Sequence, residues 1–230
     1  MDRRPPPPVG SRSPRVRPGM ATVLVAFLLV LAGGLLVLAR LEPGAPDRLA
    51  RLRDTHARLR EAEQALVAFA MRTGRLPRPA TPPDTDEGSA SDGPVLVGAL
   101  PVTPLGLPPR AGQDAWGRLL TYAVSATMTR PDAWTHEALG SLRVSGGLVG
   151  EQEGQDWALI SHGPNGAGAF LPGGQRLPLP TNAPERDNLG RAPDPDPALF
   201  RAEPWDLDPT DPTGPGTGFD DVVRVGALPR

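Results

Sequence analysis

The sequence predicts an α+β protein in which an N-terminal membrane-spanning helix continues into an amphipathic helix packed on a small antiparallel sheet, with long Pro/Gly-rich loops. Three observations lead to this prediction. The first is an uncharged apolar run long enough to cross a bilayer. The second is a long stretch with apolar residues at helical spacing, and the third is a set of short strand candidates in the C-terminal half.

The first 19 residues form a basic, Pro-rich leader. They include five arginines and four consecutive prolines, a composition that cannot bury an apolar core. Arginines are denser before the following apolar run than after it, and this bias favours a cytoplasmic N-terminus. We therefore expect residues 1–19 to be a cytoplasmic leader.

A membrane-spanning helix is predicted for residues 20–41. Residues 20–39, MATVLVAFLLVLAGGLLVLA, carry no charge, and about 20 such residues cross a hydrocarbon core roughly 30 Å thick. A buried globular helix and a cleaved secretory signal are the alternatives. The run is longer than the apolar region of a usual signal, and no small-x-small cleavage site stands clearly at its end.

An amphipathic helix is predicted for residues 47–73. Asp47 can cap its start, and Gly74 followed by Pro77 ends it. Apolar residues recur on one face, with arginine and glutamate between them. This face consists of Leu49, Leu52, Leu59, Leu66, Phe69 and Ala70.

Residues 74–230 are predicted to form a small β domain. A polar loop rich in Pro, Asp and Ser covers residues 79–94. Strand candidates follow at residues 119–125, 141–145, 157–161 and 222–225. They suggest an antiparallel sheet of three or four strands, covered by the preceding helix. Residues 172–218 have few apolar side chains and many Asp-Pro and Gly-Pro steps, so we expect them to be irregular.

The composition excludes several classes of function. The 24 Lys+Arg against 26 Asp+Glu leave a net charge of -2, which gives no basic surface for nucleic acid. Cysteine is absent, so disulfides, thiolate nucleophiles and cysteine-based zinc sites are excluded. A domain outside the cytoplasm would then depend on core packing or on a metal ion.

Short motifs follow one another along the chain. They are TGRLPRPA at 73–80, GALP at 98–101, LGL at 105–107, DAWGR at 114–118 with Tyr122, ISHGPNG at 160–166 and DDVV at 220–223. The first resembles the turn that ends the long helix of minor pilin-like proteins, and the last resembles the closing strand of pseudopilin domains. In this order, behind an apolar run, the motifs resemble those of the type IV pilin-like and type II secretion pseudopilin family.

The resemblance implies a structural subunit of a type IV pilus or type II secretion filament, and not an enzyme. It implies cleavage after Gly19 by a prepilin peptidase, which makes Met20 the new N-terminus. Such proteins usually carry a glutamate at the fifth mature position, where this chain has Leu24. Because that glutamate is thought to pair with the amino terminus of a neighbouring subunit, its absence favours a minor or tip-like member.

The same resemblance implies a location and partners. It places the chain in a bacterial inner membrane as a single-pass protein, with its C-terminal domain in the periplasm. The implied partners are other pilin or pseudopilin subunits, the prepilin peptidase and the membrane. The alternative is a membrane-anchored periplasmic binding module or enzyme that uses the N-terminal helix only as an anchor, with an intact N-terminus and a concave polar pocket.

Aspartates gather in a Gly/Pro-rich stretch near the C-terminus. They are Asp206, Asp208, Asp211, Asp220 and Asp221. Carboxylates on such a loop suit calcium, which takes six to eight oxygen ligands, and calcium-binding pseudopilins place a similar loop before the closing strand. A solvated acidic linker is the alternative, since the spacing does not match an EF-hand. No other cofactor is predicted.

Ser161 and His162 are adjacent, which raises the question of a hydrolase. A catalytic serine needs a base within hydrogen-bond reach, but adjacent strand residues point to opposite faces. The other histidines are His56 and His136, and no serine lies in a nucleophile elbow. We therefore predict no catalytic residue, and a tight turn after His162.

Overall fold

The structure is a computed structural model. It describes residues 23, 25, 27–30, 45–88, 93–131, 133, 140–147, 150–190, 199–203 and 218–228. The chain divides into two units, Met1–Pro46 and Asp47–Arg230, and each is treated by itself.

In the first unit, the described residues between 23 and 30 are helical, and their apolar side chains are exposed. The predicted leader, 1–19, and most of the predicted span, 20–41, lie outside the described residues. In the part of the chain that the structure describes, no helix is both long enough and apolar enough to cross a bilayer. The membrane-spanning helix stays a prediction.

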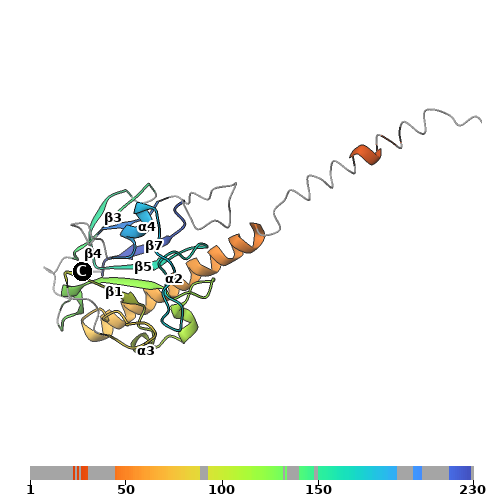
Figure 1. The fold of residues 1–230 in the computed structure, drawn as a ribbon. Helices are drawn as coiled ribbons and strands as arrows, with labels where there is room; N and C mark the ends of the chain where they lie inside the picture. The colour runs from red at the N-terminus through yellow and green to blue at the C-terminus, as the bar shows by residue number, and fades with distance from the viewer. Residues whose placement is uncertain are drawn as a thin grey trace, which may run out of the picture. The chain divides into compact units, whose positions relative to one another are not determined.

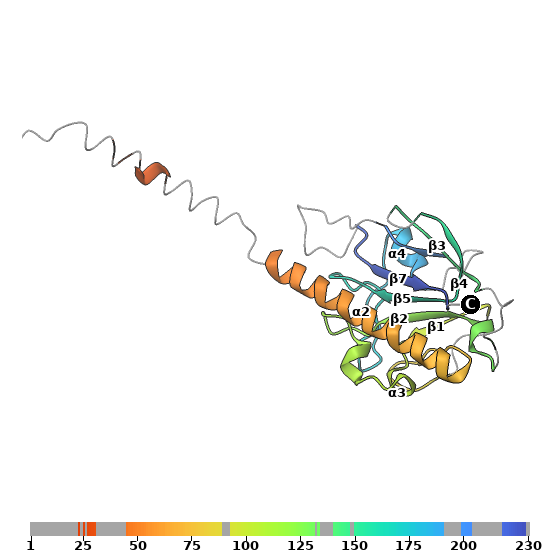
Figure 2. The same ribbon diagram turned by 180° about the vertical axis from the view of Figure 1, so that it is seen from behind.

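Helix α2, Ala45–Thr73, confirms the predicted amphipathic helix. It ends at Gly74, whose φ of 72° is left-handed and whose N–H donates to the carbonyl oxygen of Ala70 at 2.8 Å. The buried apolar face consists of Leu59, Ala62, Leu66, Phe69 and Ala70. The predicted face also includes Leu49, which is 55% exposed. Figures 1 and 2 show the reason, because the first turns of α2 extend past the sheet.

The main sheet has four antiparallel strands in the order β1-β2-β5-β7. These are β1 (Val95–Ala99), β2 (Thr121–Ser125), β5 (Trp157–Ser161) and β7 (Val222–Gly226). They confirm the strand candidates at 119–125, 157–161 and 222–225. β1 is not among the candidates, because its five residues, VLVGA, show no alternation of apolar and polar side chains.

A second sheet has three strands in the order β4-β3-β6. They are β3 (Leu142–Ser145), β4 (Gln152–Gln155) and β6 (Leu199–Arg201). β3 confirms the strand candidate at 141–145, but the expectation of a single sheet is wrong. β3 pairs with β4 and β6, in antiparallel and parallel orientation respectively, and both partners are strands that the sequence did not predict.

The expectation that residues 172–218 are irregular is also wrong in part. Their described residues include helix α4 (Ala183–Asp187) as well as β6. Phe200 of β6 is fully buried in the core between the two sheets, so this aromatic side chain packs the strand on the main sheet while β6 pairs with β3. Shorter elements elsewhere are α3 (Val102–Leu105), η1 (Pro109–Gly112) and η2 (Ala126–Thr129).

The main sheet is buried on both faces. Figure 1 shows α2 and α3 on one side of it and the second sheet with α4 on the other. Along β5, Trp157 and Leu159 belong to the core under α2, whereas Ala158 and Ile160 belong to the core between the two sheets. Because successive side chains of a strand point to opposite faces of the sheet, β5 contributes to both cores.

Candidate metal centre

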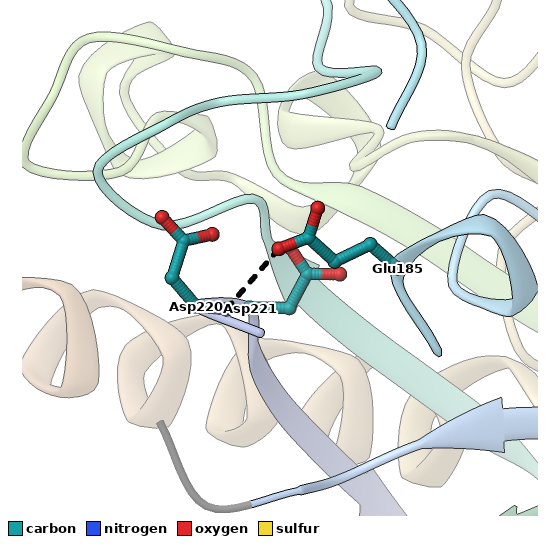
Figure 3. A group of neighbouring side chains, drawn as sticks. All are labelled: Glu185, Asp220 and Asp221. Carbon is teal, nitrogen blue, oxygen red and sulfur yellow. Dashed lines mark hydrogen bonds between the residues drawn. The ribbon is translucent and has the colours of Figure 1, made fainter. Parts of the chain in front are cut away.

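Three buried carboxylates meet where β7 begins. The side chains of Glu185, Asp220 and Asp221 are 0%, 4% and 3% exposed, and each offers an oxygen within 4.8 Å of the others. Figure 3 shows Glu185 reaching from α4 toward the two aspartates. We call these three residues the carboxylate cluster. Buried carboxylates are rare unless they are paired or bind a metal ion.

The pairing of β5 with β7 positions the two aspartates. Val222 lies opposite Ser161 in the sheet, so the residues just before β7 lie beside the turn that follows β5. Gly163 in this turn has a φ of 49°, and a Cβ there would lie 2.0 Å from the carbonyl oxygen of Asp220. Only glycine allows this close approach.

Glu185 is positioned by the first turn of α4. Asn182 caps this helix, and its Oδ1 accepts the N–H of Glu185 at 2.8 Å. One oxygen of Glu185, Oε1, accepts from Nδ2 of Asn165 at 3.1 Å and from the N–H of Asp220 at 3.2 Å (Figure 3). The turn after β5, α4 and the start of β7 therefore meet at one carboxylate.

The two aspartates are held in the same way, each by one oxygen. Oδ2 of Asp220 accepts the N–H of Asn165 at 2.8 Å. Oδ2 of Asp221 accepts from Nδ2 of Asn188 at 2.8 Å. In contrast, Oε2 of Glu185 and Oδ1 of Asp220 are buried and have no hydrogen-bond partner among the described residues. Donors therefore orient the cluster through some of its oxygens and leave these two acceptors unsatisfied.

The electrostatics show the cost of this arrangement. Burial is the largest cause that raises the pKa of Asp220 to about 8; the N–H of Asn165 opposes this shift, and the nearby carboxyls of Glu185 and Asp221 contribute to it. Burial, followed by Asp221, also raises the pKa of Glu185. Arg118 is a nearby positive charge and donates to the carbonyl oxygens of Gly163 and Pro164. A proton or a cation would favour the folded cluster.

His162 lies at the edge of the cluster. Its ring is 1% exposed, and Nε2 is 2.8 Å from Oγ1 of Thr121. Nδ1 is 3.6 Å from Oδ1 of Asp221 and has no hydrogen-bond partner. The hydroxyl of Ser161 instead donates to Oδ2 of Asp114 at 2.9 Å. Ser161 and His162 therefore have different partners, as expected for neighbours at the end of a strand.

The structure brings together two of the five predicted calcium ligands, Asp220 and Asp221. Asp206, Asp208 and Asp211 lie outside the described residues, as do the predicted processing residues Gly19 and Met20.

Sequence reasoning did not single out Glu185 as a candidate. The pattern Asn182-Ala183-Pro184-Glu185 is typical of a helix start, but nothing in it indicates that Glu185 faces Asp220. The sequence suggests His162 only as a catalytic candidate, because it does not show that Thr121 lies beside the histidine ring.

The comparisons with known proteins identify no relative. No protein-family model matches the chain, and neither a curated protein nor a solved structure matches it.

Proposed function

We propose that this chain is a pilin-like or pseudopilin-like structural subunit, of the minor or tip-like kind, anchored in a bacterial inner membrane. The observation that carries the proposal is α2. This 29-residue helix follows an uncharged apolar run in the sequence, packs one face on an antiparallel sheet, and extends past that sheet at its N-terminal end (Figure 2).

The exposed part of α2 suits contacts with neighbouring subunits. From Thr55 onward, the helix buries a residue about every turn, whereas residues 47–54 include no buried side chain. Leu49 is apolar and exposed in this segment. A helix that continues beyond its own core gives an assembling subunit a surface for other copies, and this supports a role in contacts and not in chemistry.

The motif at 114–118 joins α2 to the sheet. Nη1 of Arg58 donates to the carbonyl oxygens of Gln113 and Asp114 at 3.1 and 2.9 Å, and Oγ1 of Thr55 accepts the N–H of Ala115 at 3.1 Å. Oδ1 of Asp114 accepts from the N–H groups of Trp116 and Arg118. This motif therefore links α2 to the segment that leads into β2.

Three other motifs also lie where helices or strands begin or end. The motif at 73–80 ends α2 and leads to Ala80, which forms an isolated bridge with Ala99. The motif at 160–166 ends β5, and the motif at 220–223 begins β7. The residues on which the resemblance rests thus lie where one element ends or the next begins. This is expected for a family whose members share a fold.

The test is the mass of the mature chain. The full-length protein is expressed in a bacterium with and without a prepilin peptidase, and its intact mass and N-terminus are determined from the membrane fraction. We expect peptidase-dependent loss of residues 1–19 and an N-methylated Met20. Gly19→Val serves as the matched control and should leave the chain uncut.

Two other outcomes would overturn the proposal. An intact N-terminus in both strains supports the anchored periplasmic module or enzyme. Cleavage near the end of the apolar run, independent of the prepilin peptidase, supports a secretory signal.

A further inference from the structure

The carboxylate cluster keeps two acceptor oxygens that no described residue of the protein uses. Oε2 of Glu185 and Oδ1 of Asp220 are buried without a hydrogen-bond partner. In folded proteins the great majority of buried polar atoms have a partner. Both atoms belong to the carboxylate cluster, in which one oxygen of each residue lies within 4.8 Å of one oxygen of the others, so a bound proton or a cation would satisfy them.

His162 presents a nitrogen beside Asp221, next to the three carboxylates that lie within 4.8 Å of one another. Nδ1 is buried without a hydrogen-bond partner and lies 3.6 Å from Oδ1 of Asp221. When Nε2 carries the ring proton and donates it to Oγ1 of Thr121, 2.8 Å away, Nδ1 keeps its lone pair. A histidine that binds a metal through one nitrogen commonly donates its other N–H to a protein acceptor in this way.

The kinds of ligand distinguish between cations. Calcium takes six to eight oxygen ligands, and magnesium keeps several waters. Imidazole suits zinc, iron and their neighbours, and carboxylates are also accepted by manganese and zinc. We propose that Glu185, Asp220, Asp221 and His162 bind one divalent ion of a first-row transition metal, through three carboxylate oxygens and Nδ1 of the imidazole.

The distances and charges are compatible with this ion. Ligand atoms bound at about 2.0–2.2 Å lie roughly 3–4.4 Å from one another, so the 3.6 Å between His162 and Asp221 fits. The three carboxylates, up to 4.8 Å apart, would close slightly on binding, and Nδ1 of His162, which is not within that distance of all three, would have to move toward Glu185 and Asp220. A divalent ion balances two of the three carboxylate charges, and the guanidinium of Arg118, which Asp114 also attracts, offsets part of the third.

The proposed ion would connect three segments that are distant in the sequence. They are the turn after β5, helix α4 and the start of β7. The inference concerns this domain alone and does not depend on the filament role. It departs from the calcium site predicted by the sequence, since it uses Glu185 and a nitrogen ligand.

The test uses the full-length chain in detergent, treated with a chelator and then titrated with Mn²⁺. We expect one tight site per chain, and pulsed electron paramagnetic resonance should detect nitrogen coupling from an imidazole on the bound Mn²⁺. Zn²⁺ should displace the Mn²⁺, whereas about a hundredfold excess of Ca²⁺ should not.

Variants separate this site from other acidic groups. Glu185→Gln keeps Oε1 as an acceptor and should weaken Mn²⁺ binding at least tenfold. His162→Gln should remove the nitrogen coupling. His56→Gln, on the exposed histidine of α2, is the matched control and should change neither quantity.

Three results would overturn the proposal. They are binding of Ca²⁺ in preference to Mn²⁺ and Zn²⁺, bound Mn²⁺ without nitrogen coupling in the parent chain, and equal Mn²⁺ affinity in the parent and Glu185→Gln. The nitrogen coupling measured in the parent chain tests whether an imidazole binds the metal, even if His162→Gln does not fold.

Discussion

The core under α2 and the carboxylate cluster are both buried, but they are stabilised in different ways. Leu59, Leu66 and Tyr122 pack together on the α2 side of the main sheet, where removal from water is itself favourable. Glu185 and Asp220 are equally removed from water, and their raised pKa values show that burial there is costly. Burial stabilises the first region without help, whereas the second region needs a bound proton or cation.

The largest expected effect tests the apolar region. Leu66 is 0% exposed in the core under α2, so Leu66→Ala should lower the free energy of unfolding by about 2–5 kcal/mol. Leu49→Ala, on the exposed first turns of the same helix, should change it by less than about 0.5 kcal/mol. Denaturant unfolding of both variants measures the difference, and equal effects would contradict the assignment of the buried face.

The next effect tests the carboxylate cluster through pH. The pKa of Asp220 rises from an ordinary value of 3.8 to about 8 on folding, so the folded chain binds more protons than the unfolded chain between these values. Its contribution to stability is complete below pH 3.8 and is lost as the pH rises through about 8. In chelator, the free energy of unfolding should therefore fall by about 3 kcal/mol between pH 6 and pH 8.5.

The control for this pH dependence is Asp220→Asn, which removes the titrating carboxyl and keeps an oxygen to accept from Asn165. Thermal unfolding measured across this pH range should show a flatter profile in the variant. A stability that rises with pH in the parent chain would mean that Asp220 is ionised in the folded state, and the contrast with the apolar core would then be wrong.

The smallest effect concerns a contact between β7 and α2. Arg224 of β7 pairs with Glu63 of α2, and both side chains are partly exposed. Exposed ion pairs contribute little, so Arg224→Gln should cost about 0.2–1 kcal/mol, and less at high salt. Denaturant unfolding at two salt concentrations measures this, with Arg60→Gln on α2 as a control. A loss as large as that of Leu66→Ala would show that charge, and not apolar packing, holds β7 to α2.

The candidate site was only partly predictable from the sequence. Asp220 and Asp221 stand out because they precede a strand and lie near other aspartates. Glu185 does not stand out, since its burial depends on α4 docking beside the turn after β5. The sequence position of His162 also does not indicate that Thr121 lies beside one nitrogen of its ring and Asp221 near the other.

The sequence by itself determined the local elements of the second unit. The apolar spacing and the following Gly74 define α2, and strands β2, β3, β5 and β7 lie where apolar and β-branched residues gather. Each of these features depends on residues within a few positions of one another, so a local pattern is sufficient.

Only the tertiary structure decided how these elements are combined. β3 joins a second sheet because its partners, β4 and β6, are short strands without a clear pattern of their own. The carboxylate cluster likewise forms only when β7 pairs with β5 and α4 packs nearby. Such contacts join residues that are distant along the chain, and packing determines them where local periodicity cannot.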